Sequence, residues 1–295
     1  MKFSLLKLLF FLPTVNSLIK GINWFGFETE YKNLMCTWTN DIEWNIKKIK
    51  ELDFNYIRLP FSLEFVNDAN WQEMDHFFDI SYKYDIDVVL DFHRLHSTHQ
   101  SFRPYDNHFT FDDFLDSWRI ILDRYKSYSN LKGVDIFNEY QGNNVVEWNN
   151  LSRQIVSFIE SQFPERFDFY VGGVRWGGNL YGVKLDDLPY NDRITYTIHK
   201  YWFSDGIDEE AWAATFDKEN HKLISVGEWG YKTDGTEFEK IFAIEFVDWL
   251  KDNNIRDTFF WTWTYNSGDT GGILKEDCTT VDYEKIRLLH NLWYN

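Results

Sequence analysis

Two glutamates in this chain each close a strongly apolar stretch. Glu139 ends "GVDIFNE" and Glu228 lies in "LISVGEW". A pair of carboxyl groups that flank a glycosidic bond can hydrolyse it, because one protonates the leaving oxygen while the other acts as nucleophile or base. Their environments must then differ, so that one carboxyl stays protonated and the other stays ionised near neutral pH. The pair therefore predicts glycoside hydrolysis.

Further polar side chains also stand at the ends of apolar runs. They are Arg58, His93, Asn138, His199 and Tyr201, followed later by the aromatic segment from Trp261 to Trp263. A guanidinium such as that of Arg58 can keep a neighbouring carboxylate ionised, and the amide of Asn138 can donate to a sugar hydroxyl. Side chains so distant in sequence act together only if the fold gathers the ends of several strands at one place.

Eight apolar, strand-like segments recur along the chain, and amphipathic segments separate them. The expected strands are residues 19–27, 56–61, 87–93, 133–139, 167–174, 193–199, 223–229 and 257–263. The expected helices are residues 42–52, 71–84, 111–125, 146–163, 237–253 and 283–293, whereas the glycine-rich residues 175–188 are expected to form a loop with at most a short helix. In the first helix, Ile42, Ile46 and Ile49 recur at three- and four-residue spacing, which gives one apolar face.

This alternation is typical of α/β proteins with a parallel sheet. A single closed (β/α)8 TIM barrel is the simplest arrangement for 295 residues. Its strands all end at one face, so the polar residues named above would converge there. An open doubly wound sheet is the alternative, but no glycine-rich phosphate-binding loop follows the first strand.

The N-terminal residues 1–17, "MKFSLLKLLFFLPTVNS", have the features of a secretory signal peptide. Lysines border an apolar run that is too short for a confident transmembrane helix, and Val15 and Ser17 precede the expected cleavage point. We therefore expect residues 1–17 to be removed, residues 18–295 to form the catalytic domain, and the protein to be secreted to the extracellular space.

The net charge and the aromatic content of the chain limit the kinds of molecule that it is expected to bind. The chain has 47 acidic and 30 basic residues, a formal net charge of −17, and no basic block, which argues against binding to nucleic acid or to an anionic membrane. A neutral substrate fits better. Most of the 14 tryptophans are expected to fill the core, and some are expected to form flat platforms for sugar rings.

Motifs spread over residues 19–289 resemble glycoside hydrolase family 5, the cellulase family on a (β/α)8 barrel. The general motifs are "IRLPFS", "DFH", "NE", "HKY" and "GEWG". Three longer segments, "GINWFGFET", "RWGGNL" and "SGDTGGILKEDCTTVD", are similar to the secreted bacterial endo-β-1,4-glucanase branch. The resemblance implies a cellulase that cleaves internal bonds of β-glucan with retention of configuration, through a covalent glycosyl-enzyme intermediate and without a metal or other cofactor.

The resemblance also implies a role for each residue at the strand ends. Glu139 of "NE" would be the general acid/base, and Glu228 of "GEWG" would be the nucleophile. Arg58 would hydrogen-bond Glu228, while His199 would lie near the acid/base and Tyr201 near the nucleophile.

Sugar contacts follow from the same resemblance. His93 and Asn138 would bind hydroxyls of the sugar at the cleavage site, and Trp261 would be the platform for that sugar. Trp24 and Trp176 would be platforms for neighbouring sugars. Asp269 in "GDTGG" either belongs to a simple turn or borders the cleft, and it is a second-rank binding candidate.

Three further features of the sequence are its two cysteines, a histidine-rich loop and a glycosylation sequon. Cys36 and Cys278 lie in the loops after the first and last strands, which are neighbours in a closed barrel, so we expect a disulfide between them. The histidines at 96, 99 and 108 crowd one loop, yet no metal-site spacing accompanies them and we expect solvated side chains. Asn150 begins a glycosylation sequon, usable only in a host that glycosylates secreted proteins.

Alternatives stay open on the substrate. The same machinery can cut mannan, xyloglucan or mixed-linkage β-glucan, because the loops that shape the cleft differ from those of the bacterial branch, and Tyr140 stands where the family usually has proline. A non-catalytic carbohydrate-binding barrel is the alternative outside enzymes, but it would be expected to lack one carboxylate or Arg58. A monomer is expected, since a cleft enzyme that acts on a polymer needs no partner chain.

Overall fold

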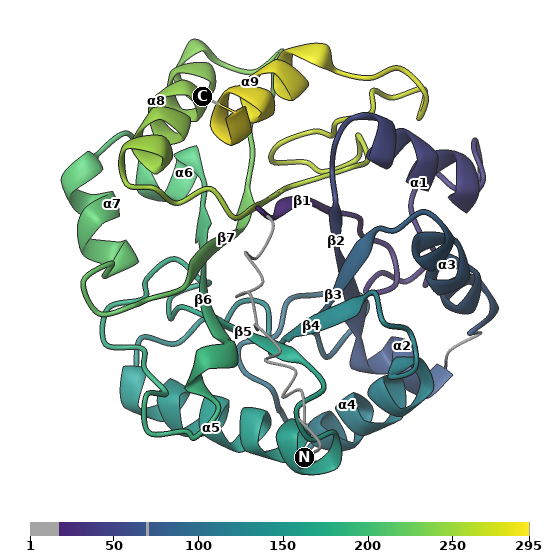
Figure 1. The fold of residues 1–295 in the computed structure, drawn as a ribbon, viewed down its shortest axis with the longest axis vertical. Helices are drawn as coiled ribbons and strands as arrows, with labels where there is room; N and C mark the ends of the chain where they lie inside the picture. The colour runs from purple at the N-terminus through teal and green to yellow at the C-terminus, as the bar shows by residue number, and fades with distance from the viewer. Residues whose placement is uncertain (1–17, 69–70, 295) are drawn as a thin grey trace, which may run out of the picture.

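Eight parallel strands close into a barrel in sequence order in the computed structural model, which describes residues 18–68 and 71–294 (Figure 1). They are β1 (Lys20–Asn23), β2 (Tyr56–Ser62), β3 (Asp87–Arg94), β4 (Leu131–Asp135), β5 (Asp168–Gly172), β6 (Ile194–Lys200), β7 (Ile224–Trp229) and β8 (Thr258–Phe260). Pairing of β1 with β8 closes the ring. The predicted (β/α)8 barrel is therefore confirmed, and the open sheet is wrong.

Helices form the outer ring around the strands (Figure 1). They are α1 (Ile42–Glu51), α2 (Leu63–Asp68), α3 (Gln72–Lys83), α4 (Phe111–Tyr125), α5 (Val145–Gln162), α6 (Trp202–Asp205), α7 (Glu209–Phe216), α8 (Glu237–Asp252) and α9 (Tyr283–Tyr294), with a 3-10 turn at Asn191–Arg193. Each of the six predicted helices appears with its ends shifted by no more than one residue. Capping boxes at Thr110 and Thr236 start α4 and α8 where the apolar periodicity begins.

Inside the barrel, an apolar layer lies next to a polar end at the carboxyl ends of the strands. Phe259 and Tyr170 form the apolar layer together with Val89. Gly21 and Gly133 make this possible, because a Cβ on either would collide with the ring of Phe259 or Tyr170, respectively. The remaining core lies between the strands and the helices, so the open, polar end of the barrel is left for a site.

A disulfide joins Cys36, in the loop after β1, to Cys278, in the loop after β8, with an S–S distance of 2.08 Å. This is the pairing expected from the sequence, and it connects positions 242 residues apart.

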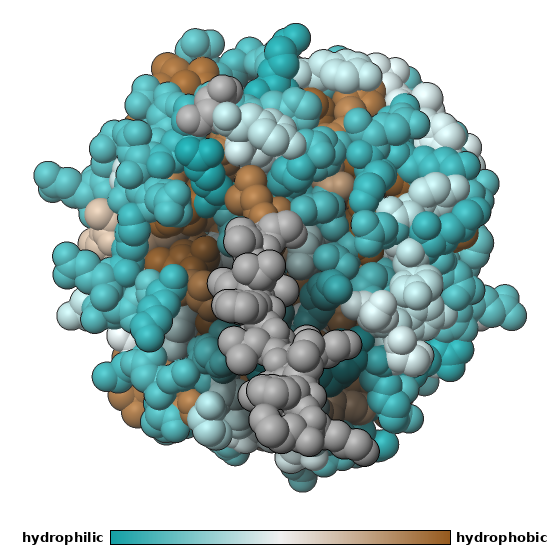
Figure 2. Space-filling model, viewed as in Figure 1, coloured by the Kyte–Doolittle hydropathy of each residue, from teal (hydrophilic) through white to brown (hydrophobic). Residues whose placement is uncertain are grey.

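The visible surface is mostly hydrophilic, with scattered apolar groups (Figure 2). Among the described residues no helix is both long and apolar enough to cross a membrane. The expected signal peptide, residues 1–17, lies outside the described residues and stays a prediction.

Candidate active site

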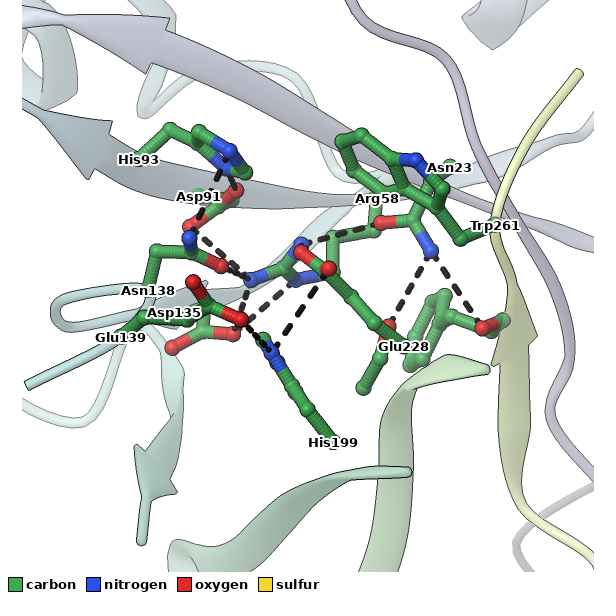
Figure 3. A network of polar contacts seen from close by, with 12 residues as sticks. Asn23, Arg58, Asp91, His93, Asp135, Asn138, Glu139, His199, Glu228 and Trp261 are labelled. Carbon is green, nitrogen blue, oxygen red and sulfur yellow. Dashed lines mark hydrogen bonds and ion pairs between the residues drawn. The ribbon is translucent and has the colours of Figure 1, made fainter. Parts of the chain in front are cut away.

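The side chain of Arg58 lies at the centre of the polar end of the barrel and is 1% exposed (Figure 3). Its guanidinium contacts Asn23, Asp91, Asp135, Asn138 and Glu228 at 2.7–3.1 Å. One cation thus faces three carboxylates. Burial raises the pKa of Asp91 to about 7 and that of Asp135 to about 6, although Arg58 opposes both shifts. The cluster therefore holds fewer negative charges at neutral pH than it has carboxyl groups.

Glu228 is the next-to-last residue of β7, and both of its carboxylate oxygens are bonded. Arg58 donates to Oε1 at 2.7 Å, and the hydroxyl of Tyr201 donates to Oε2 at 2.8 Å. Tyr201 follows β6, where His199 is the register partner of Glu228. Two donors aimed at one carboxylate hold it in a fixed orientation, which places an oxygen for attack on a bound sugar.

Glu139 follows β4 and lies in a different environment. Its Oε1 is 3.0 Å from Nδ1 of His199. Burial lowers the pKa of His199, so the ring is neutral and its Nδ1 shares one hydrogen bond with this carboxyl group. Burial raises the pKa of Glu139 to about 7, with Arg58 opposing the shift and the negative charge of Asp269 adding to it. Glu139 can therefore carry a proton near neutral pH.

The two glutamates lie close together. An oxygen of Glu139 and an oxygen of Glu228 are within 4.8 Å of each other. Carboxyl groups of retaining glycosidases are about 5–5.5 Å apart, whereas those of inverting enzymes are about 6.5–9.5 Å apart because a water must fit between them. The upper limit of 4.8 Å on the oxygen–oxygen distance favours the closer, retaining arrangement.

Both glutamates line a cleft of about 680 Å³. His93, Trp176, Trp261 and Asp269 also line it. The ring of Trp261 lies nearly parallel to that of His93, with centroids 5.5 Å apart.

His93 is held in one orientation in this cleft. Burial lowers its pKa to about 3, and Nδ1 donates to Asp91 at 2.6 Å, so Nε2 is an acceptor. The amides of Asn138 and Gln100 both approach that nitrogen at 3.4 Å. Arg58 fixes the other side of the Asn138 amide by donating to its oxygen. A sugar that stacks on Trp261 would therefore meet oriented polar groups.

A family model described as Cellulase (glycosyl hydrolase family 5) matches residues 15–267 of the chain. The chain belongs to glycosyl hydrolase family 5. It is therefore a glycoside hydrolase, and its barrel retains both carboxylates and Arg58, contrary to the expectation for a non-catalytic binding protein.

Relatives and solved structures agree with this family assignment. An endoglucanase from Paenibacillus polymyxa is 28% identical over 91% of this chain and 81% of that protein. The major extracellular endoglucanase of Xanthomonas campestris is 28% identical over 93% of this chain and 67% of that protein. An endocellulase from Pyrococcus horikoshii in complex with cellotetraose superposes with a TM-score of 0.84 at 26% identity, covering 93% of this chain and 92% of that one.

The prediction for Trp24 is wrong. Its side chain is fully buried in this family 5 barrel, donates from Nε1 to the carbonyl of Met35, and packs edge-on against Phe77 of α3. Asn23 points into the barrel, so the next residue points outward into the layer between strands and helices. Trp24 is therefore a core residue and not a sugar platform.

Trp38 is the exposed tryptophan of the same loop. It is 63% exposed and lines a groove of about 580 Å³ with Tyr31 and Tyr265. Because this groove lies between the loops after β1 and β8, it is on the same face of the barrel as the catalytic cleft. A tryptophan between two threonines, outside any apolar run, was the sequence signal for this exposure.

Asn23, Asp91 and Asp135 were not singled out from the sequence. Each bonds to Arg58 from within or at the end of a buried strand. A signal was present, because Asp91 is two residues from His93 in "DFH" and therefore shares its face of the strand.

The expectation for the histidine-rich loop is wrong at one position. His99 and His108 are exposed, but His96 is 7% exposed and lies between Glu64 and Asp106 at 3.0 and 2.6 Å. These two carboxylates raise its pKa against the effect of burial. His96 therefore anchors the loop to α2.

Tyr140 does not line the cleft lined by the catalytic glutamates. It is 1% exposed and stacks on Trp148 of α5 with ring centroids 4.9 Å apart. The residue that replaces the usual proline of the family thus contributes to packing behind Glu139.

Two groups of side chains could hold a metal ion among residues 18–68 and 71–294. They are Asp91, His93 and Glu228, and Glu139, His199 and Glu228. Both share Glu228, and the guanidinium of Arg58 already occupies one of its oxygens. A metal cation would have to approach this fixed positive charge.

Proposed function

We propose that this chain is a secreted, retaining endo-β-1,4-glucanase. The observation that carries the proposal is the pair of glutamates within 4.8 Å, one with a raised pKa and the other bonded by Arg58 and Tyr201. The names of the Paenibacillus and Xanthomonas relatives support the activity, and the cellotetraose complex of the Pyrococcus endocellulase supports a β-1,4-glucan substrate.

In the first step Glu228 attacks the anomeric carbon and forms an ester bond to it. The bond to the leaving oxygen breaks as Glu139 gives that oxygen a proton. In the second step Glu139, now ionised, removes a proton from water, and the water oxygen displaces Glu228 from the anomeric carbon. Two displacements at one carbon restore its original configuration.

The sugar at the cleavage site would lie on Trp261, with His93 and Asn138 at its hydroxyls. The groove of Tyr31, Trp38 and Tyr265 would continue the chain on the side of β1 and β8, and Trp176 would contact the leaving part of the chain. No cofactor and no partner chain enters these steps.

Secretion is supported by residues 1–17 and by the word "extracellular" in the name of the Xanthomonas relative. Mannan, xyloglucan and mixed-linkage β-glucan are the rival substrates, because the loops after β3 and β4 determine which hydroxyl orientations fit.

The test compares hydrolysis of carboxymethylcellulose, mannan, xyloglucan and mixed-linkage glucan, and follows the first product of a cello-oligosaccharide by proton NMR. We expect carboxymethylcellulose to be cleaved most efficiently and the β-anomer to appear first. Initial α-anomer would contradict the retaining mechanism. A faster rate on another polymer would show that this polymer, and not β-1,4-glucan, is the preferred substrate.

A further inference from the structure

We infer that Lys200 is a positioning residue that sets the half of the cleft where the leaving part of the glucan chain binds. The inference rests on the proposed retaining function and concerns a side chain that does not itself line the cleft. Lys200 lies on β6 between His199 and Tyr201 and is fully buried.

The leaving group lies on the side of the acid that protonates it. Glu139 follows β4, and the loops after β5 and β6 carry the next cleft residues, Trp176 and Phe203. Trp261 follows β8 at the other end of the same cleft. Trp176 and Phe203, which are 55% and 52% exposed, are therefore the aromatic surfaces available to the leaving sugar chain.

The ammonium group of Lys200 joins these two loops. Nζ donates to the carbonyl of Gly178, in the loop after β5, at 3.0 Å. It also donates to Oδ1 of Asp205, at the end of α6, at 2.6 Å. The second oxygen of Asp205 accepts from the backbone N–H of Tyr201 and from the hydroxyl of Ser204. One buried charge thus holds both a backbone carbonyl of the loop after β5 and the α6 turn.

The loop that carries Trp176 needs such support. Arg175 and Trp176 have φ values of 55° and 54°, a left-handed conformation that is unfavourable for residues with a side chain. Backbone N–H groups of these two residues bond to the carbonyls of Gly142 and Tyr140. The bond from Lys200 holds the loop at Gly178, two residues after Trp176, and its loss would let the platform move.

Phe203 depends on the same group from the other side. Its ring stacks on that of Tyr201 with centroids 5.1 Å apart and planes 11° from parallel. Since Asp205 closes the α6 turn that contains Phe203, release of Asp205 from Lys200 would loosen this second surface. Burial lowers the pKa of Lys200, and the negative charge of Asp205 opposes that shift.

The experiment compares two substrates in Lys200→Met. Cellohexaose needs sugar sites on both sides of the cleavage point, whereas 2,4-dinitrophenyl β-cellobioside has no leaving sugar. We expect kcat/KM on cellohexaose to fall on the order of ten- to a hundredfold, as misplaced positioning groups do. On the aryl cellobioside kcat/KM should stay close to the wild-type value. A merely structural role would lower both.

Lys285 provides a matched control, since it is the other buried lysine among the described residues. Its Nζ donates to the carbonyls of Thr270 and Gly272. Thr270 in turn donates to the carbonyl of Trp261, and Ser267 accepts from its indole N–H. Because Trp261 serves the sugar retained by both substrates, Lys285→Met should lower kcat/KM on both.

Equal losses on the two substrates, or no loss, in Lys200→Met would overturn the inference. If circular dichroism shows that this variant does not fold, Lys200→Gln is measured instead. It keeps a donor but no charge for Asp205, and the same selective loss is required. Failure of the wild-type protein to cleave the aryl cellobioside would instead overturn the proposed function.

Discussion

The hydroxyl of Tyr201 donates to Glu228 at 2.8 Å, on the carboxylate oxygen that Arg58 leaves free. The two donors together fix the plane of the nucleophile before substrate binds. Such fixed donors contribute to catalysis because they need no reorganisation during the reaction.

Tyr201→Phe should therefore lower kcat/KM on cello-oligosaccharides. A hydrogen bond to a charged group contributes about 1.5–3 kcal/mol, which is roughly a ten- to hundredfold change in rate. Tyr196→Phe, on the preceding strand β6, is the matched control, because its hydroxyl accepts from the backbone of Leu185 instead. Equal kinetics in the two variants would contradict the assignment of Tyr201.

The two glutamates should respond differently to a change of leaving group. Glu228→Gln should remove nearly all activity on carboxymethylcellulose and on 2,4-dinitrophenyl β-cellobioside, and it should block covalent labelling by a fluorinated glycoside. Glu139→Gln should lose the polysaccharide activity but still release dinitrophenolate in the first step, because that group leaves without a proton. Full carboxymethylcellulose activity in either variant would refute the site.

The pH dependence follows from the pKa of Glu139. The general acid must carry a proton, so kcat/KM on cellohexaose should fall as the pH rises through about 7. The negative charge of Asp269 raises this pKa, hence Asp269→Asn should lower it and move the alkaline limb to lower pH. Asp234, exposed and outside the cleft, supplies the control variant Asp234→Asn. An unmoved or upward-shifted limb in Asp269→Asn would count against the coupling.

The fold and the two reactive carboxylates were predictable because they follow from local patterns. Recurring apolar runs predicted the strands, and the 3.6-residue periodicity predicted the long helices. Glu139 and Glu228 stand out at the ends of two of these runs. The short helices α2, α6 and α7 were missed, since six, four and eight residues give too little periodicity.

Interior polar contacts were harder to predict for a different reason. Asp91 and Asp135 are single acids inside apolar strands, and their role depends on an arginine from another strand. Trp24 was assigned as a platform from the family motif alone, whereas alternation from Asn23, the last residue of β1, places its side chain in the layer between strands and helices.

The disulfide should contribute to the stability of the fold and not to the rate of catalysis. It closes a loop of 242 residues and joins the β1 and β8 loops. Replacing Cys36 and Cys278 with serine should lower the free energy of unfolding by about 2–5 kcal/mol while kcat on the aryl cellobioside persists at low temperature. Chemical denaturation measures the first effect. Mass spectrometry after alkylation without reductant checks the bond itself, and two labelled thiols in the native protein would exclude it.

Substitution of Trp38 should affect substrate binding, whereas substitution of Trp24 should affect the stability of the fold. Trp38→Ala removes an exposed ring from the groove on the side of β1 and β8. The KM for cellohexaose should therefore rise roughly tenfold, which corresponds to a loss of about 1–2 kcal/mol of binding free energy. Thermal stability should change little. Trp24→Ala removes a buried ring and should lower stability by about 3–5 kcal/mol. Trp24→Phe keeps most of the buried volume and should leave KM unchanged. Isothermal calorimetry with cello-oligosaccharides, on an inactive Glu228→Gln background, measures the affinity directly. Loss of affinity in the Trp24 variants and not in Trp38→Ala would restore Trp24 as the sugar platform suggested by the sequence motif.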